Sequence, residues 1–332
     1  MRSWSATLGL DRNAGKEGEP DASLPAAPER KQPEQGIALA LGGGAARGWA
    51  HIGILKAFDE AGIPIDMIAG TSIGALVGGC YLAGKLPELE EFALSLTRRR
   101  IFGLLDFRFG GSGLLAGMRL TNRMREHLEG LNIEDLPKPF VCVASELRTG
   151  HEVWLTRGSL ITAIRASYAL PGVFAPVICN GRMLVDGALV NPVPVSVCRA
   201  YEQPIVVGIN LNNHIFGRAA VIRHSAEAAE SLDPPDRDSE LLLPTPEAIA
   251  HVPDRSPKPM GLLGVMIESF NIIQDRITRA RLAGDPPDLT LQLKLGDLGL
   301  AEFHRAAEAI EIGYTTGKAH APEIMHMLEM VS

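Results

Sequence analysis

Aromatic residues are scarce in this chain: phenylalanine, tyrosine and tryptophan together make up 5% of its 332 residues. So few rings argue against a surface on which nucleic-acid bases stack. The formal net charge is −7, so the basic surface that a phosphate backbone requires is missing as well. We therefore predict that the protein has no nucleic-acid partner.

Cysteine is also rare, and no two of the four cysteines have C-x-x-C spacing. Each lies in a mainly apolar stretch, which is typical of reduced core residues rather than of metal ligands or disulfides. A hydrophobic content of 46% allows a core that needs no such crosslinks. We predict neither a metal site nor a cofactor. The four residues are Cys80, Cys142, Cys179 and Cys198.

The N-terminus lacks the apolar segment of a secretion signal, because Leu8 and Leu10 are isolated among polar residues. A cytoplasmic protein is therefore expected. Residues 67–84 carry no charge and reach the length limit of a membrane span. They nevertheless contain five glycines and begin as a strand followed by a turn. We predict a buried strand, a tight turn and a buried helix there.

Composition divides the chain into a tail and one domain. Residues 1–35 are rich in Gly, Pro, Glu and Lys, which predicts a disordered N-terminal tail. Residues 36–332 form the predicted domain. Within it, 213–260 is rich in proline, which indicates an insertion that serves as a lid or is disordered. The sequence contains no internal repeat.

Short apolar runs alternate with helical patterns along the domain. Two strand–turn–helix units in succession predict a mainly parallel sheet that is covered by helices. The expected strands are 37–41, 65–69, 140–144, 205–209 and 289–295, and the expected helices are 48–61, 75–83, 159–169 and 300–314.

The motif Gly70-x-Ser72-x-Gly74 lies between a predicted strand and a predicted helix. In that context G-x-S-x-G indicates a nucleophile elbow, a sharp turn that projects the serine oxygen beyond the sheet at a helix N-terminus. The flanking glycines leave room for the neighbouring strand and helix. Ser72 is thus the candidate nucleophile, and a Gly/Ser turn without chemistry is the alternative.

A second glycine-rich turn, Gly42 to Gly48, also joins a strand to a helix. A dinucleotide fingerprint would need glycine in place of Arg47, and a phosphate loop would need lysine in place of Trp49. The remaining use of bare amides there is an oxyanion hole, built from Gly42, Gly43, Gly44 and Ala45. Arg47 would hold the loop or a substrate phosphate, or form a surface salt bridge.

Two further residues are candidates for proton transfer. His51 lies one turn into the first helix, where the helix dipole would lower its pKa, and we interpret it as a packing residue. Asp186 ends a short apolar segment before Gly187. It either caps its own turn or serves as a base.

Four ordered motifs resemble one family, the patatin-like phospholipases. They are the glycine loop with Ala50-His51-Ile52-Gly53, the elbow, the block 166–176, and Asp186-Gly187-Ala188. The segment 276–285 resembles the bacterial subgroup that is related to the catalytic part of neuropathy target esterase. One departure is Ala45, where many members carry glycine.

The resemblance implies a three-layer α/β/α fold and a Ser–Asp dyad of Ser72 and Asp186, supported by Arg47, Gly70, Gly74 and Gly187. It implies a phospholipase A, lysophospholipase or esterase that cleaves phospholipid or lysophospholipid through an acyl-enzyme, independently of calcium. It also implies peripheral contact with the inner face of the membrane. The sequence leaves the oligomeric state unknown.

Two alternatives remain open. One is a Ser–Asp–His triad with His214 or His224 as the base. The other is a regulatory protein that retains the fold without turnover.

Overall fold

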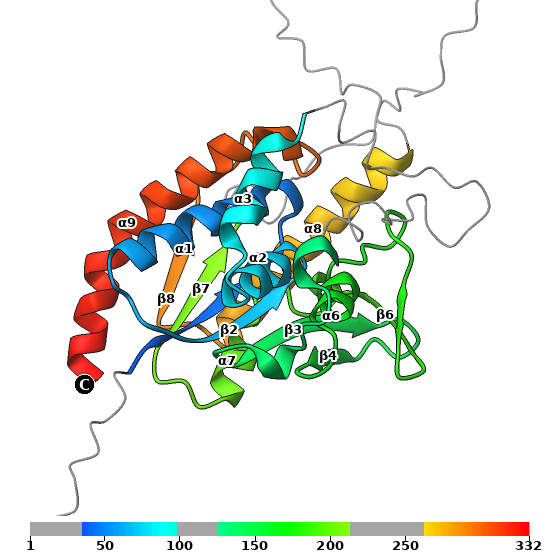
Figure 1. Ribbon diagram of the computed structural model, residues 1–332. Coiled ribbons are helices and arrows are strands. Elements are labelled where there is room, and N and C mark those ends of the chain that lie inside the picture. Colours follow the sequence, from blue (N-terminus) through cyan, green and yellow to red (C-terminus); the bar gives the residue numbers. More distant parts are fainter. Residues whose placement is uncertain (1–34, 98–124, 213–261, 332) are drawn as a thin grey trace, which may run out of the picture. The chain divides into compact units, whose positions relative to one another are not determined.

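The computed structural model describes residues 35–97, 125–212 and 262–331, and a mixed β-sheet lies at its centre (Figure 1). The sheet strands are β1 Ile37–Leu41, β2 Ile65–Thr71, β3 Phe140–Glu146, β4 Glu152–Leu155, β5 Val177–Cys179, β6 Arg182–Asp186, β7 Val206–Asn210 and β8 Leu289–Gln292.

Helices connect most of these strands, and short turns join β3 to β4 and β5 to β6. The α-helices are α1 Ala50–Glu60, α2 Ile73–Leu82, α3 Leu86–Ser95, α6 Leu160–Ser167, α7 Val195–Ala200, α8 Leu262–Gly284 and α9 Ala306–Val331. Short 3₁₀ turns are η1 Ala45–Trp49, η2 Ile133–Asp135, η3 Gly187–Leu189 and η4 Phe303–Arg305.

The strand order is β5-β6-β3-β2-β1-β7-β8, with β4 paired to β3. Strands β3, β2, β1, β7 and β8 are parallel, whereas β4 and β6 run antiparallel to β3. Because β1 and β2 are adjacent and parallel, the turns that follow them lie side by side at the carboxyl ends of the strands.

Strand β3 brings the ends of two other strands together. Strand β2 pairs with β3 up to Val143, and β6 pairs with β3 from Ala144 onwards. Strand β4 pairs with residues Cys142 to Ser145, which overlaps both partners. Strand β4 must therefore occupy the opposite edge of β3, so β2 and β6 share one edge and meet end to end. This arrangement places the residues after Thr71 beside Asp186.

Helices cover both faces of the sheet. Ile37, Leu39 and Leu41 of β1 join a large apolar cluster with α1, α2 and α9. Ala38 and Ala40 face the other way, into a smaller cluster that contains residues of α7. Alternate residues of one strand thus pack against different helical layers, as the period of a strand requires. The architecture is a three-layer α/β/α fold, as predicted.

Helices α1 and α9 lie side by side over the first face, as Figure 1 shows. Glycine permits this close approach. A Cβ atom on Gly53 would lie 1.9 Å from the Ile310 carbonyl oxygen, and one on Gly313 would lie 2.0 Å from the Ala50 carbonyl oxygen.

Most predicted elements are present with shifted ends. Ser159 caps α6 by accepting a hydrogen bond from the Thr162 amide. The predicted helix 48–61 begins as the 3₁₀ turn η1 and becomes α-helical at Ala50. The alternation over 289–295 overestimated β8, which ends at Gln292, although Leu293 and Leu295 are buried. Burial alone therefore produced that part of the pattern.

The uncharged segment 67–84 forms β2, a turn and the buried helix α2, as predicted. In the part of the chain that the structure describes, no helix is long and apolar enough to cross a membrane. All four cysteines are free thiols. The predicted insertion 213–260 lies outside the described residues, as do residues 1–34 of the predicted tail.

Candidate active site

Ser72 stands alone between the end of β2 and the start of α2, with φ 57° and ψ −122°. A side chain with this backbone conformation is strained by about 1–3 kcal/mol, and the surrounding structure must hold it there. The two flanking glycines make the turn possible. A Cβ atom on Gly70 would lie 2.6 Å from the Ala75 nitrogen, and one on Gly74 would lie 2.2 Å from the Leu41 carbonyl oxygen.

A second serine, Ser167, stabilises this turn through hydrogen bonds. The Ser72 amide donates to Ser167 Oγ at 2.9 Å, and Ser167 Oγ donates to the Val143 carbonyl oxygen at 2.6 Å. Thr71 Oγ1 donates to the Asn191 carbonyl oxygen at 2.8 Å. Sequence reasoning did not assign these supporting roles. The only signal for Ser167 was its place in the block 166–176.

Asp186 meets Ser72 directly. Ser72 Oγ donates to Asp186 Oδ2 at 2.7 Å, and the Ala188 amide donates to Oδ1 at 2.8 Å. Ser145 Oγ holds the Asp186 backbone by donating to its carbonyl oxygen at 2.9 Å. Asp186 therefore caps its own turn and also faces the serine. Both side chains of the pair are buried, Ser72 at 8% exposure and Asp186 at 2%.

Burial raises the pKa of Asp186 to about 7, because desolvation disfavours the charged carboxylate. The hydrogen bonds from the Ala188 amide and the Ser72 hydroxyl oppose this shift without cancelling it. A carboxylate with a pKa near neutrality can both accept and return a proton at physiological pH.

The glycine loop lies beside the pair. A Cβ atom on Gly43 would lie 3.5 Å from Ser72 Cβ and 3.3 Å from Ala188 Cβ. The amides of Gly42 and Gly43 donate to the carbonyl oxygens of Ile209 and Pro192 at 3.2 and 2.9 Å.

The next two amides of the loop, those of Gly44 and Ala45, differ in their hydrogen bonding. Within the described residues, no acceptor takes the amides of Gly44 and Ala45, where η1 begins. Ala45 is held at φ 48°, a conformation that glycine adopts without strain. The loop thus offers two bare amides at the start of a helical turn.

Arg47 is buried and therefore forms no surface salt bridge. Its Nε donates to the Leu298 carbonyl oxygen at 2.7 Å, and its Nη1 donates to Asn212 Oδ1 at 3.4 Å. Burial lowers the pKa of Arg47, and the charge of Glu268 in α8 opposes that shift. Arg47 fixes the loop to two distant segments of the chain.

His51 is buried, as predicted, and it also holds the loop. Its Nε2 lies 2.8 Å from the Gly42 carbonyl oxygen, which only accepts, so Nε2 carries the proton. Desolvation lowers the pKa of His51 to about 4. The shift has the predicted direction, but burial and not the helix dipole is its largest cause. The alternative bases, His214 and His224, lie outside the described residues.

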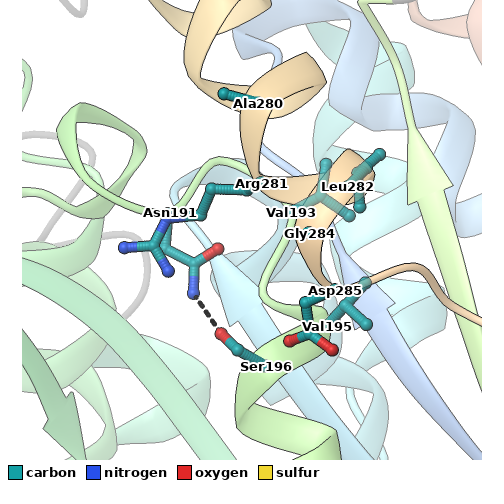
Figure 2. Close-up of a pocket in the computed structure, with 9 residues that line it drawn as sticks. All are labelled: Asn191, Val193, Val195, Ser196, Ala280, Arg281, Leu282, Gly284 and Asp285. Atoms are coloured by element: carbon teal, nitrogen blue, oxygen red, sulfur yellow. Dashed lines mark hydrogen bonds between the residues drawn. The ribbon is translucent and has the colours of Figure 1, made fainter.

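A hollow of about 270 Å³ lies elsewhere, between α7, the C-terminal end of α8 and the segment that precedes α7 (Figure 2). Asn191, Ser196, Arg281 and Asp285 contribute its polar groups. Neither Ser72 nor Asp186 lines it. Asn191 connects the two places, because its carbonyl oxygen accepts from Thr71 while its side chain donates to Ser196 Oγ at 3.0 Å.

Comparison with known proteins identifies the family. The family model for patatin-like phospholipase matches residues 39–199, which contain both Ser72 and Asp186. An uncharacterized NTE family protein of Mycobacterium tuberculosis is 35% identical over 320 residues, covering 83% of this chain and 89% of that protein.

Two larger eukaryotic proteins match about half of this chain. Human patatin-like phospholipase domain-containing protein 6 is 32% identical over 185 residues, covering 53% of this chain and 13% of the human protein. Lysophospholipase NTE1 of Mycosarcoma maydis is 33% identical over 192 residues, covering 53% of this chain and 10% of that protein. The extent of the mycobacterial match, together with the family model, shows that this chain belongs to the patatin-like phospholipase family and shares its fold.

Proposed function

We propose that this chain is a serine acyl hydrolase that cleaves carboxylic esters of lipids through an acyl-enzyme on Ser72. The contact between Ser72 Oγ and Asp186 Oδ2, at 2.7 Å, carries the proposal. Family membership and relatives named phospholipase and lysophospholipase support a lipid substrate. We propose phospholipid or lysophospholipid as its class.

In the acylation step, Ser72 Oγ attacks the ester carbonyl carbon while Asp186 Oδ2 accepts the serine proton. The carbonyl π electrons move to oxygen and form a tetrahedral oxyanion. When the intermediate collapses, the C–O bond to the alcohol breaks and Asp186 returns its proton to the departing oxygen. The acyl group remains on Ser72.

Deacylation repeats the sequence with water. Asp186 accepts a proton from a water molecule that attacks the acyl carbonyl carbon. Collapse of the second tetrahedral intermediate breaks the bond to Ser72 Oγ, and Asp186 returns the proton to that oxygen. The products are a carboxylic acid and the restored pair.

The oxyanion requires donors that the protein has not already used. Within the part of the chain that the structure describes, the amides of Gly44 and Ala45 meet this condition, whereas those of Gly42 and Gly43 donate to the protein backbone. We assign the two free amides as donors, and Gly42 and Gly43 as the residues that shape the loop beside Ser72. One such donor in a comparable hydrolase contributes about 3–4 kcal/mol to the stability of the transition state.

The direct contact favours a dyad over a triad. In a triad, an imidazole lies between the serine and the carboxylate, and the carboxylate only orients the ring. Here Ser72 Oγ and Asp186 Oδ2 are within hydrogen-bond distance of each other, which leaves no space for a ring between them. We therefore propose the carboxylate itself as the base.

A fluorophosphonate probe tests the proposal, since it labels only an activated serine. Wild-type protein should be labelled and should hydrolyse lipid esters. Ser72→Ala should lose both properties and stay folded, whereas Ser196→Ala should keep both. An unlabelled, inactive wild-type protein would support the regulatory alternative, and an active Ser72→Ala variant would refute the assignment of the nucleophile.

We also propose that the enzyme acts in the cytoplasm and contacts the inner face of the membrane only peripherally. Alkaline carbonate releases peripheral proteins from membranes but leaves spanning proteins in place. Protein that stays with the membrane after this treatment would contradict the proposal.

A further inference from the structure

Helix α8 has its polar and apolar faces exchanged relative to an ordinary surface helix. The side chains it buries against the protein are polar: Asn271, Gln274, Asp275 and Thr278, each at 4% exposure or less. Its large apolar side chains Val265, Met266, Ile272 and Ile273 are 43–46% exposed. A surface helix normally turns its apolar stripe towards the core, so this outward face calls for a partner.

The buried polar face serves the proposed oxyanion loop. Asn212 Nδ2 donates to Gln274 Oε1 at 3.2 Å and lies 3.5 Å from the Gly43 carbonyl oxygen. Thr278 Oγ1 donates to the Gln274 carbonyl oxygen at 2.7 Å within the helix. The polar groups of α8 are therefore needed on the inner side, next to the site.

The outward face carries two arginines, and one of them, Arg279, is paired through its Nε with Asp275 Oδ2 at 2.9 Å. Within 265–284, the exposed side chains include Arg276 and Arg279, while the two acidic residues, Glu268 and Asp275, are not exposed. The remaining exposed positions are small: one serine, two alanines and a glycine. In a protein of net charge −7, a helix face that exposes Arg276 and, within 265–284, no carboxylate suits a partner that is apolar and negatively charged.

The face also lies close to the dyad. The methyl group of Met266 lies against Gly172, since a Cβ on that glycine would be 2.7 Å from Met266 Cε. Gly172 belongs to the loop that follows Ala169, whose carbonyl oxygen accepts from the Asp186 amide at 3.0 Å. A partner bound to the exposed face of α8 would thus lie next to the segment that positions Asp186.

We propose that the exposed face of α8, defined by Val265, Met266, Ile272, Ile273, Arg276 and Arg279, docks on a lipid surface that contains anionic phospholipid. The isoleucines enter the acyl boundary, and Arg276 contacts the lipid phosphates. The inference rests on the proposed function, because the role of this docking is to bring a lipid ester in the membrane to Ser72.

The test measures binding to vesicles by co-sedimentation of the full chain carrying Ser72→Ala, so that the vesicles are not consumed. Two adjacent isoleucines are replaced in Ile272→Gln/Ile273→Gln, because glutamine keeps helix propensity and removes apolar area. The matched control is Met330→Gln/Val331→Gln, an exposed apolar pair at the end of α9, at 69% and 42% exposure. Vesicles are phosphatidylcholine alone or with roughly a third phosphatidylglycerol.

The isoleucine variant should bind either vesicle about tenfold more weakly or worse, and the control should bind like the parent protein. Arg276→Gln should lose about fivefold on the anionic vesicles only. Equal binding by the isoleucine variant and the control overturns the proposal. Unchanged vesicle binding accompanied by a dimer-to-monomer change assigns the face to a second copy, and a fall in Tm instead assigns it to another segment of this chain. Either result overturns the lipid proposal.

Hydrolysis of a soluble short-chain ester separates the two proposals, and it is measured with Ser72 intact. An isoleucine variant that hydrolyses the soluble ester normally but loses vesicle binding and vesicle hydrolysis supports the docking surface. A wild-type protein that binds vesicles but hydrolyses no ester refutes the proposed function and leaves the docking surface standing. One that hydrolyses the ester but binds no vesicle refutes the surface alone.

Discussion

The turns after β1 and β2 are similar in composition and backbone conformation, but they present different chemical groups. Both follow adjacent parallel strands, both contain glycine, and both hold one non-glycine residue at positive φ, Ala45 at 48° and Ser72 at 57°. The first turn has two backbone amides without an acceptor among the described residues, and the second projects a side chain. The difference lies in what supports each turn, because Ser72 is tied to Ser167 and Asp186, whereas the first turn is anchored through His51 and Arg47.

Under the proposed mechanism, the ends of two adjacent strands provide two kinds of chemistry. An oxyanion hole needs backbone amides that donate to no protein acceptor, and a serine nucleophile needs a base within hydrogen-bond distance. Substitutions in the two turns should therefore fail in different ways.

Replacing Asp186, the proposed base, should have the largest effect. In Asp186→Asn the side chain keeps its shape and can still accept from the Ala188 amide, but it cannot take the serine proton. We expect kcat to fall by about a thousandfold or more, close to the loss in Ser72→Ala. Steady-state hydrolysis of a soluble ester measures this, and circular dichroism checks the fold. A well-folded variant with more than about a tenth of wild-type activity would rule out Asp186 as the base.

Alanine in place of one glycine in each turn should separate activity from stability. In Gly43→Ala the new methyl group would lie beside Ser72 Cβ, in the space that the proposed mechanism assigns to the substrate carbonyl, so kcat/KM should fall by about a hundredfold with little change in Tm. In Gly74→Ala the methyl group would meet the Leu41 carbonyl oxygen, and stability should fall by about 3 kcal/mol.

Thermal unfolding and ester hydrolysis, measured on both variants, distinguish these outcomes. Equal loss of stability in the two would mean that the first turn is as tightly enclosed as the second.

Acid should remove activity through Asp186. Because its pKa is raised to about 7, the free enzyme holds the carboxylate increasingly protonated below that pH. We expect kcat/KM to fall about tenfold for each pH unit below 7 and to level off above it. A pH–rate profile that stays flat down to pH 5 would contradict a base with a raised pKa.

The raised pKa of Asp186 also makes the free energy of unfolding depend on pH, and that free energy should fall as the pH rises. Unfolded Asp186 has a pKa of about 4, so the native state alone keeps the proton between about pH 4 and pH 7. Its contribution to the free energy of unfolding is complete below about pH 4 and is lost as the pH rises through 7, by up to about 4 kcal/mol. Asp186→Asn should not show this loss, and denaturant titrations at several pH values compare the two proteins.

Histidine replacements should have the smallest effect on the chemical step. Single replacements of His51, His151, His214 or His224 should each cost no more than about tenfold, or about 1.4 kcal/mol. For His51 the conservative test is His51→Gln, which can still donate to the Gly42 carbonyl oxygen. Burst kinetics with a chromogenic ester isolate the acylation step. A folded histidine variant as inactive as Ser72→Ala would replace the dyad with a triad.

The sequence alone determined the local features of this protein. Glycine spacing around Ser72 predicted the elbow, since only that residue pattern permits so sharp a turn between a strand and a helix. Continuous apolar runs predicted the buried strands 37–41 and 65–69, and Ser159 predicted the start of α6. These features depend on residues that are close in the chain, so their signals are local.

Tertiary structure decided how those features combine. Strand β3 pairs with β2 and β6 along one edge, and this long-range pairing alone brings Asp186 to Ser72. The same holds for the raised pKa of Asp186, which comes from burial by distant segments. The exposed apolar face of α8 is a further case: its pattern has helical periodicity, but only the packed structure shows that the polar side faces inward. Burial is a property of the whole fold, so no single segment of sequence specifies it.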